Sequence, residues 1–384
     1  MKAPCQAGSA ALQFTNVTLR GTKLVLNGLG GISNGAVTLL ASTNLLLPLT
    51  SWTASATNTF DGSGRFSLTN TVNPSVRPQF YALRVSPAPN ALWVPSCGAW
   101  LGAACTNGTT QAFTAHESRI GRQLDVLRIY HTPGSWTSLT STERAYIGAG
   151  RKLLLSVKPA SLWSNAVGAA NGGSPTVDAQ MASLAKSIAG IKPAKAMLIV
   201  WHEPENDVIG GGGPGNAGTT AQYVSMWHNV RSIFDSNGAT NVIWCWCVQN
   251  LSQYRSLLAS LWPGNDYVDW VIWDAYKDGS SLSLTNVIQA GYNWLMTNST
   301  TAHNYGSKPF GLGELGVGIN SYYPTVADQT NGINQLNAAL NSNNQFPKIK
   351  LISYFDLNAS ALLPGALPAY SNYAHSSYLT QQCP

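Results

Sequence analysis

The chain has 384 residues and a formal net charge of +6, and only 10% of its side chains are charged. Its 22 basic residues are spread along the sequence without a basic run, which argues against a dedicated nucleic-acid-binding protein. No apolar stretch has the length that a membrane span requires. We therefore expect neither nucleic acid nor a membrane among its partners.

Residues 1–86 predict a small all-β domain. Short apolar runs alternate there with turns rich in Asn, Gly and Ser, as in an antiparallel sandwich. Pro87, Ala88 and Pro89 then predict a linker at residues 87–90. The stretch 41–84 resembles small β modules that are appended to secreted bacterial enzymes. Such a module could bind carbohydrate or could act only as a spacer.

Residues 91–384 predict an α/β domain, a (β/α)8 TIM barrel. Eight apolar runs alternate with amphipathic segments, and about 290 residues is an ordinary length for such a barrel. The expected strands are residues 91–94, 126–130, 152–157, 196–201, 241–246, 267–275, 309–312 and 349–355. The expected helices include residues 140–149, 178–191, 221–236, 284–297 and 331–340.

Glu203 and Glu314 each follow a short apolar run where the chain is expected to turn, after strands four and seven. Pro204 blocks a simple continuation of the first run, and Gly311 and Gly313 allow a sharp turn after the second. The carboxyl ends of barrel strands share one rim, so we expect both glutamates there. Two carboxylates at one rim suit the cleavage of a glycosidic bond, in which one is the acid and the other the nucleophile or base.

The barrel region resembles the clan A glycoside hydrolases, in which the acid/base follows strand four and the nucleophile follows strand seven. His202 before Glu203 is most similar to glycoside hydrolase family 26, and so are Asp274 and Tyr276 at the end of strand six. The resemblance implies a retaining enzyme with Glu203 as the acid/base and Glu314 as the nucleophile. It also implies that Tyr276 hydrogen bonds the nucleophile.

The chain departs from family 26 directly after the acid/base, where Pro204, Glu205 and Asn206 replace the usual Met-Asn-Gly, so the resemblance specifies the chemistry more closely than the substrate. That family acts mostly on β-mannan, so an endo-acting enzyme on β-1,4-mannan is the first expectation. The alternatives are a β-1,3-xylanase or a β-1,3-1,4-glucanase of the same fold. A barrel that binds carbohydrate without cleaving it is the competing class.

The composition fits a sugar-binding cleft. The chain has 13 Trp and 15 Tyr, and aromatic rings pack against the apolar faces of sugars. The side chains that we expect to contact substrate lie at or beyond strand ends, although a tryptophan there can equally belong to the core. They are His131, Lys158, Trp163, His202, Glu205, Asn206, Trp246, Trp273, Asp274 and Tyr276.

We expect neither a metal ion nor another cofactor. An HExxH zinc motif that begins at His202 would need a second His where the chain has Asn206, and Pro204 interrupts the helix. A serine hydrolase is a poorer alternative, because no Gly-x-Ser-x-Gly motif occurs. The expected protein is a monomer whose partner is a polysaccharide.

The spacing of the cysteines gives information on the redox compartment in which the protein works. Cys97 and Cys105 bracket a short Gly/Ala stretch, and a disulfide between them would fit an oxidising compartment. Cys245 and Cys247 lie on one face of strand five and are expected to be buried thiols.

We expect a secreted protein. No hydrophobic signal sequence follows Met1, so a signal peptide would be missing from this sequence. Cys5 and Cys383 can pair only if the chain ends meet, and the sequence leaves that open.

Overall fold

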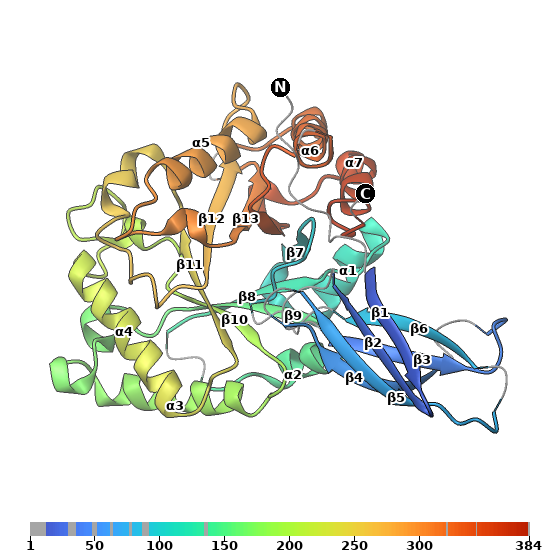
Figure 1. The fold of residues 1–384 in the computed structure, drawn as a ribbon. Coiled ribbons are helices and arrows are strands. Elements are labelled where there is room, and N and C mark those ends of the chain that lie inside the picture. Colours follow the sequence, from blue (N-terminus) through green and yellow to red (C-terminus); the bar gives the residue numbers. More distant parts are fainter. Residues whose placement is uncertain are drawn as a thin grey trace. The chain divides into compact units, whose positions relative to one another are not determined.

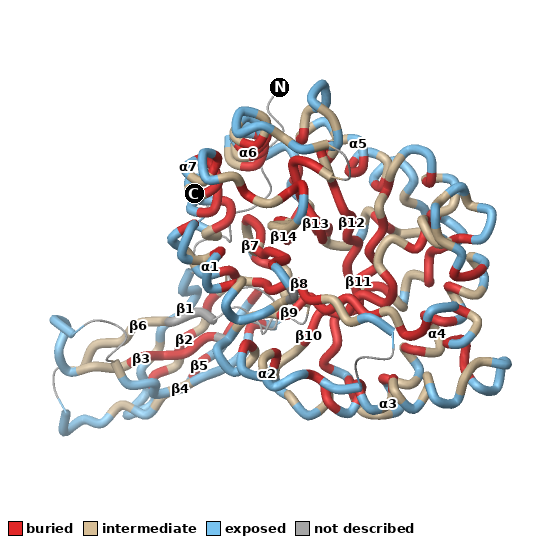
Figure 2. The backbone as a smooth tube through the Cα atoms, turned by 180° about the vertical axis from the view of Figure 1, so that it is seen from behind, coloured by how far each residue is buried: buried red, intermediate tan, exposed pale blue. Residues whose placement is uncertain are grey.

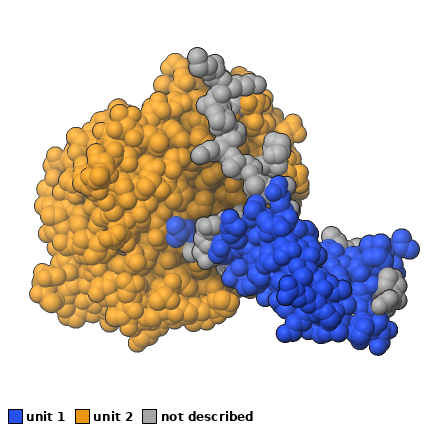
Figure 3. All heavy atoms as spheres, viewed as in Figure 1, with its two compact units in different colours: residues 1–93 blue, residues 94–384 orange. Residues whose placement is uncertain are grey.

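The computed structural model describes residues 13–29, 36–47, 52–61, 64–76, 79–86, 92–133, 137–319, 322–342 and 344–382. The chain divides into two compact units, Met1–Trp93 and Val94–Pro384 (Figure 3). Each unit has a hydrophobic core of its own. The predicted linker at residues 87–90 lies outside the described residues.

The first unit is an all-β domain of two three-stranded antiparallel sheets (Figure 1). Buried and more exposed side chains alternate along two strands of the first sheet, Lys23–Leu29 and Phe66–Thr71, and the apolar face so formed packs against that of the second sheet. The two apolar faces share one core, made of Leu24, Leu26, Val37, Leu39, Phe60, Phe66 and Leu68. The first sheet has the order β1 (Gln13–Arg20), β2 (Lys23–Leu29), β5 (Phe66–Thr71), and the second has the order β4 (Thr53–Thr59), β3 (Ala36–Ser42), β6 (Phe80–Ser86). The predicted sandwich-like domain is confirmed.

The second unit is a closed barrel of eight parallel strands in chain order, with helices on its outer side (Figures 1 and 2). The strands are β7 (Trp100–Ala104), β8 (Val126–His131), β9 (Lys152–Val157), β10 (Ala196–Val200), β11 (Val242–Val248), β12 (Trp270–Lys277), β13 (Phe310–Val317) and β14 (Ile349–Phe355). The helices are α1 (Thr110–Ile120), α2 (Ser141–Gly148), α3 (Pro175–Ala189), α4 (Thr220–Ser236), α5 (Leu284–Thr297), α6 (Val326–Asn341) and α7 (Leu367–Ala374). The predicted (β/α)8 barrel is confirmed. Within the described ranges, no helix is both long and apolar enough to cross a membrane.

The first barrel strand is the one that the sequence pattern misplaced. The pattern predicts it at residues 91–94, but it lies at Trp100–Ala104, where it pairs with β14 and β8. Most of its residues are small, and a run of Gly and Ala lacks the β-branched side chains by which a strand is recognised. It is nevertheless buried from Leu101 onward, because it closes the barrel.

Strand β13 is longer than the predicted 309–312 and carries Glu314 within it. Its pairing with β12 shifts by one residue, because Trp273 pairs with Leu312 whereas Asp274 pairs with Glu314. Gly313 is the extra residue, and a Cβ there would lie 2.7 Å from Asp274 Oδ1. The irregularity places Glu314 directly beside Asp274.

The two ends of the barrel unit lie side by side. The Ala99 N–H donates to Tyr378 O at 3.0 Å. The approach is so close that a Cβ on Gly98, whose φ is +63°, would lie 1.9 Å from the same oxygen. Arg122, two residues beyond the end of α1, donates to Leu379 O at 2.9 Å and holds that segment in place.

The predicted Cys97–Cys105 disulfide is wrong, because Cys105 is a free and buried thiol. Strand β7 lies between the two cysteines, and its five residues separate them by about 17 Å, far beyond the Cα separation that a disulfide allows. Both cysteines of β11 are free and buried, as predicted. A pairing of Cys5 with Cys383 lies outside the described residues.

Candidate active site

Glu314 is held by two hydroxyls and a guanidinium inside the barrel. Tyr130 of β8 donates to its Oε1, and Tyr276 of β12 donates to its Oε2, each at 2.5 Å. Arg128 Nη2 lies 3.6 Å from Oε1, and Arg128 Nε donates to the Tyr130 hydroxyl at 3.2 Å. Both carboxylate oxygens of Glu314 are therefore occupied by groups that favour its ionised form.

Tyr276, Tyr130 and Arg128, the three groups that contact Glu314, keep their protons. Burial raises the pKa of Tyr276, and the charge of Glu314 raises it further. Burial also raises the pKa of Tyr130, and the opposing effect of Arg128 does not reverse this. Burial lowers the pKa of Arg128, but Tyr130 and the nearby acidic groups raise it by more. The two tyrosines thus act as donors and Arg128 as a cation.

Glu203 lies in a tight turn after β10. Trp201 and Glu203 both adopt positive φ, at +60° and +51°, which is uncommon for residues other than glycine. The Glu203 N–H donates to Cys247 O at 3.0 Å, which ties the turn to β11. Asn206 Nδ2 donates to Glu203 Oε2 at 3.0 Å. This bond restrains the Glu203 carboxyl, which is close enough to Glu314 to sense its charge.

The surroundings of Glu203 favour its protonated form. Burial raises the pKa of its carboxyl to about 8, with further contributions from the charges of Glu314 and Glu205. Arg128 and Lys158 lower the pKa by less. Glu203 is thus a carboxylic acid at neutral pH.

His202 lies between the turn of Glu203 and Tyr130, one of the tyrosines that hold Glu314. Its Nδ1 lies 3.0 Å from Ser156 Oγ, and its ring packs edge-on against Tyr130 with centroids 5.5 Å apart. Burial lowers the pKa of His202, and the positive charges of Arg128 and Lys158 lower it further. A neutral His202 therefore separates the turn of Glu203 from the tyrosine that holds Glu314.

Asp274 lies beside Glu314 but is only 2% exposed. Burial raises its pKa well above the usual range, and the charge of Glu314 raises it further. Cys247 Sγ donates to Asp274 at 3.4 Å. A protonated Asp274 adds no second negative charge next to Glu314, and its burial corrects the expectation that it contacts substrate.

All three tryptophans that were expected to contact sugar are core residues instead. Trp163, Trp246 and Trp273 are each no more than 1% exposed and belong to the barrel's hydrophobic core. Glu205 is also fully buried, behind the turn rather than in front of it. These four side chains do not reach solvent, so we correct the expectation that they contact substrate.

Lys158 lies at the rim next to the turn of Glu203. Its Nζ is 3.4 Å from Asp207 Oδ2 and 4.7 Å from the centre of the Trp201 ring. Asp207 also accepts a hydrogen bond from Trp201 Nε1 at 2.7 Å. Lys158 is partly exposed and can reach a ligand at the rim.

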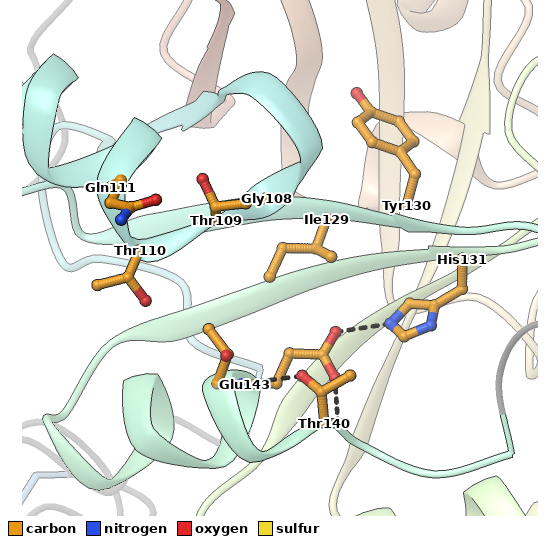
Figure 4. A pocket seen from close by; sticks show the side chains of 10 residues that line it. Gly108, Thr109, Thr110, Gln111, Ile129, Tyr130, His131, Thr140 and Glu143 are labelled. Atoms are coloured by element: carbon orange, nitrogen blue, oxygen red, sulfur yellow. Dashed lines mark hydrogen bonds and ion pairs between the residues drawn. The ribbon is translucent and has the colours of Figure 1, made fainter.

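A cavity of about 700 Å³ lies between β8 and the first turns of α1 and α2, and Tyr130 is one of its lining residues (Figure 4). Tyr130 and Ile129 point to opposite sides of β8, and His131 lies at the end of the strand (Figure 4). His131 Nε2 is 2.6 Å from Glu143 Oε1, and Glu143 also caps α2. The remaining lining residues are mostly hydroxyl-bearing or amide-bearing: Gly108, Thr109, Thr110, Gln111, Thr140 and Thr142. Such a wall can hydrogen bond a neutral polyhydroxylated ligand.

Sequence reasoning missed Arg128 and Tyr130. Their signal is present in the predicted strand at residues 126–130, where an arginine interrupts an apolar run. Side chains two apart on a strand share a face, so Arg128 and Tyr130 point together into the barrel. A fully buried arginine needs an anionic partner, and here that partner is Glu314.

One cluster has the composition of a metal site. Cys105, His116 and Asp356 offer ligand atoms that all lie within 4.8 Å of one another. His116 Nδ1 is already 2.7 Å from Asp356 Oδ2, and Arg119 pairs with the same oxygen at 3.3 Å. Burial raises the pKa of the Cys105 thiol, and Asp356 raises it further. The cluster is therefore accounted for as an ion-pair network beside a protonated thiol.

Comparisons with solved structures identify the fold. The GH26 β-mannanase of Bacteroides ovatus matches with a TM-score of 0.54 at 16% identity, over 75% of this chain and 92% of that one. The barrel shares its fold with this enzyme. GH26C of Muricauda sp. matches with a TM-score of 0.53 at 15% identity, over 77% of this chain and 90% of that one. The GH26 domain of a Prevotella bryantii endo-β-mannanase/endo-β-glucanase matches with a TM-score of 0.52 at 16% identity, over 75% and 92%.

Sequence comparison finds one curated relative. Endoglucanase H of Acetivibrio thermocellus is 28% identical over 199 residues, which is 48% of this chain. The match covers 20% of that protein's length. No family model matches the chain.

Proposed function

We propose that the protein is a retaining endo-β-glycanase, with Glu203 as the acid/base and Glu314 as the nucleophile. The observation that carries the proposal is the contrast between the two carboxyls. The pKa of Glu203 is about 8, whereas Glu314 accepts hydrogen bonds from Tyr130 and Tyr276 on both oxygens. An acid/base must hold a proton at neutral pH, and a nucleophile must be ionised.

In the first step Glu203 donates its proton to the leaving glycosidic oxygen while a Glu314 oxygen attacks the anomeric carbon. The carbon–oxygen bond to the leaving group breaks, and a glycosyl ester forms on Glu314. In the second step the Glu203 carboxylate takes a proton from water, and that water attacks the anomeric carbon and releases Glu314. Two inversions leave the product in the β configuration.

The electrostatics support this exchange of roles. The charge of Glu314 is the second cause of the raised pKa of Glu203, after burial. Formation of the ester removes that charge, so the pKa of Glu203 falls when Glu203 has to become a base. Asp274 stays protonated nearby and does not replace the lost charge.

β-1,4-Mannan is the substrate that we propose first. The family 26 resemblance and the β-mannanase names of the matching structures support it. The cavity beside Tyr130 offers hydroxyl and amide groups for a sugar residue away from the scissile bond. β-1,3-1,4-Glucan is the second candidate, because the curated relative is named an endoglucanase.

Hydrolysis of purified β-1,4-mannan, β-1,3-xylan and β-1,3-1,4-glucan tests the proposal, with Glu314→Ala as the inactive control. We expect internal cleavage of one polymer, and NMR of the first products should show the β-anomer before mutarotation. An α-anomer formed first would establish inversion and remove the nucleophile role. Binding of a polymer without cleavage would identify a carbohydrate-binding barrel.

A further inference from the structure

Glu205 is a buried carboxyl two residues beyond the acid/base. It lies in the short helix η5 (Pro204–Asp207) and is fully shielded from solvent. Its Oε1 accepts the backbone N–H groups of Gln249 and Asn250 at 2.7 and 3.0 Å. Its Oε2 has no hydrogen-bond partner among the residues that the structure describes. Burying a carboxyl with one oxygen unbonded costs folding free energy, which suggests that Glu205 has a role at the site.

The contacts of Glu205 fasten the catalytic turn to strand β11. The Glu203 N–H already bonds to Cys247 O at 3.0 Å, and Glu205 adds two bonds just beyond the end of that strand. Asn250 is fixed in turn, because its Nδ2 donates to Gly291 O of α5 at 3.1 Å. The Glu205 side chain, on the same turn, thus stabilises the positive φ of Glu203.

The electrostatic surroundings of Glu205 are acidic. Burial raises its pKa to about 7, the N–H groups of Asn250 and Gln249 lower it, and Asp207 raises it. Glu203 itself faces Glu314 and Glu205 as acids and Arg128 and Lys158 as cations. Tyr223 of α4 is close enough to Glu205 to sense its charge, and it is protonated, because burial and Glu205 raise its pKa.

We infer that Glu205 is a positioning residue for the acid/base: it pins the turn of Glu203 to the end of β11 and places a negative charge behind the Glu203 carboxyl. The inference rests on the proposed function. Pinning and charge are separable, since a glutamine at position 205 keeps an oxygen that can accept both backbone N–H groups but removes the charge. An alanine removes both.

The test compares two aryl β-glycosides of the sugar that the wild-type protein cleaves. One has a poor leaving group that needs protonation, and the other has a 2,4-dinitrophenyl leaving group that does not. For Glu205→Ala we expect kcat/KM to fall at least about tenfold more on the first substrate than on the second, because only the first depends on Glu203 as an acid. For Glu205→Gln we expect a smaller loss and a basic limb of the pH profile moved to lower pH by about half a unit.

Asp269→Ala is the matched control. Asp269 is less buried than Glu205, but burial raises its pKa as well, and it accepts the Trp244 N–H at 2.8 Å near the start of β11, far from the rim. Its loss should lower kcat/KM on both aryl substrates by the same factor. Unfolding temperatures measured in parallel separate a folding defect from a catalytic one.

Equal losses on both substrates for Glu205→Ala would overturn the inference and leave Glu205 a structural residue. If Glu205→Ala does not fold, Glu205→Gln decides, because an unmoved basic limb overturns the inference as well. The proposed function fails separately, if Glu203→Ala shows no dependence on the leaving group in the same assay.

Discussion

Glu203 and Glu314 are the same side chain in opposite surroundings. Glu314 accepts two tyrosine hydroxyls and lies 3.6 Å from a buried guanidinium, all of which favour a carboxylate. Burial, together with the charges of Glu314 and Glu205, raises the pKa of Glu203 to about 8. The difference teaches that the two roles can be assigned from the local donors and charges, without knowing which sugar is bound.

The largest expected effect comes from removing Glu314, the carboxyl whose surroundings favour the ionised form. Glu314→Ala should lower kcat by about 10⁴-fold or more on every substrate, because no other group is placed to form the glycosyl ester. Initial rates on the best polymer and on an activated aryl glycoside measure it. Loss on the polymer alone would mean that Glu314 is not the nucleophile.

Removing Glu203, the protonated carboxyl, should have a smaller effect that depends on the leaving group of the substrate. Glu203→Ala should lower kcat/KM by about 10²- to 10⁴-fold on a substrate with a poor leaving group, since that is what general acid catalysis supplies. A dinitrophenyl leaving group should restore much of the rate, and azide should yield a β-glycosyl azide. Equal loss on both substrates without an azide product would contradict the acid/base role.

The tyrosines test the donors of Glu314 directly. Each hydroxyl donates to a charged oxygen, and such a bond contributes about 1.5–3 kcal/mol, so Tyr276→Phe should lower kcat/KM roughly 10- to 150-fold. Tyr130→Phe should have a comparable effect and should also release Arg128 Nε. Tyr223→Phe is the matched control, because that buried tyrosine contacts Val200 O instead of Glu314. Comparable losses in all three variants would assign the effect to packing.

The smallest effect is on pH dependence. Because Glu203 must be protonated, activity should decline as pH rises through about 8. The folded pKa exceeds the ordinary value of 4.5, so the folded state holds this proton where the unfolded state has lost it. Stability from this group is therefore complete below about pH 4.5 and is lost as pH rises toward 8.

Glu203→Gln should remove that dependence. We expect the variant to gain about 1–3 kcal/mol of unfolding free energy relative to the wild type at pH 8 or above, and much less at pH 5. Urea unfolding at both values measures the difference. An equal change at the two pH values would show that Glu203 does not keep its proton in the folded state.

The sequence predicts the architecture well, because seven of the eight strands are strongly apolar runs. The exception is β7, whose Trp-Leu-Gly-Ala-Ala sequence has almost no strand preference and is ordered only by its neighbours β8 and β14. The missed strand also explains the wrong disulfide, since the Gly/Ala stretch between Cys97 and Cys105 gives no sign of an extended strand that would hold the two cysteines apart.

The candidate site is predictable only in part. Glu203, Glu314 and Tyr276 stand out because they follow or end apolar strands, and the contact from Tyr276 to Glu314 is present at 2.5 Å. The tryptophans are not predictable, because an indole beside a strand end packs equally well inward or outward. Glu205 is not predictable either, since its burial depends on Gln249 and Asn250, which are more than forty residues away.

The contact between Ala99 and Tyr378 has a consequence for how the barrel unit can be combined with other domains. A domain whose entry and exit lie side by side can be spliced into a surface loop of another protein, or cut elsewhere and rejoined end to end, without pulling a strand out of its barrel. We expect a circular permutant that joins the segment after Leu379 to the segment before Ala99, with new ends in an exposed helix-to-strand loop, to fold. Recombination of modules around this barrel then requires no change within it.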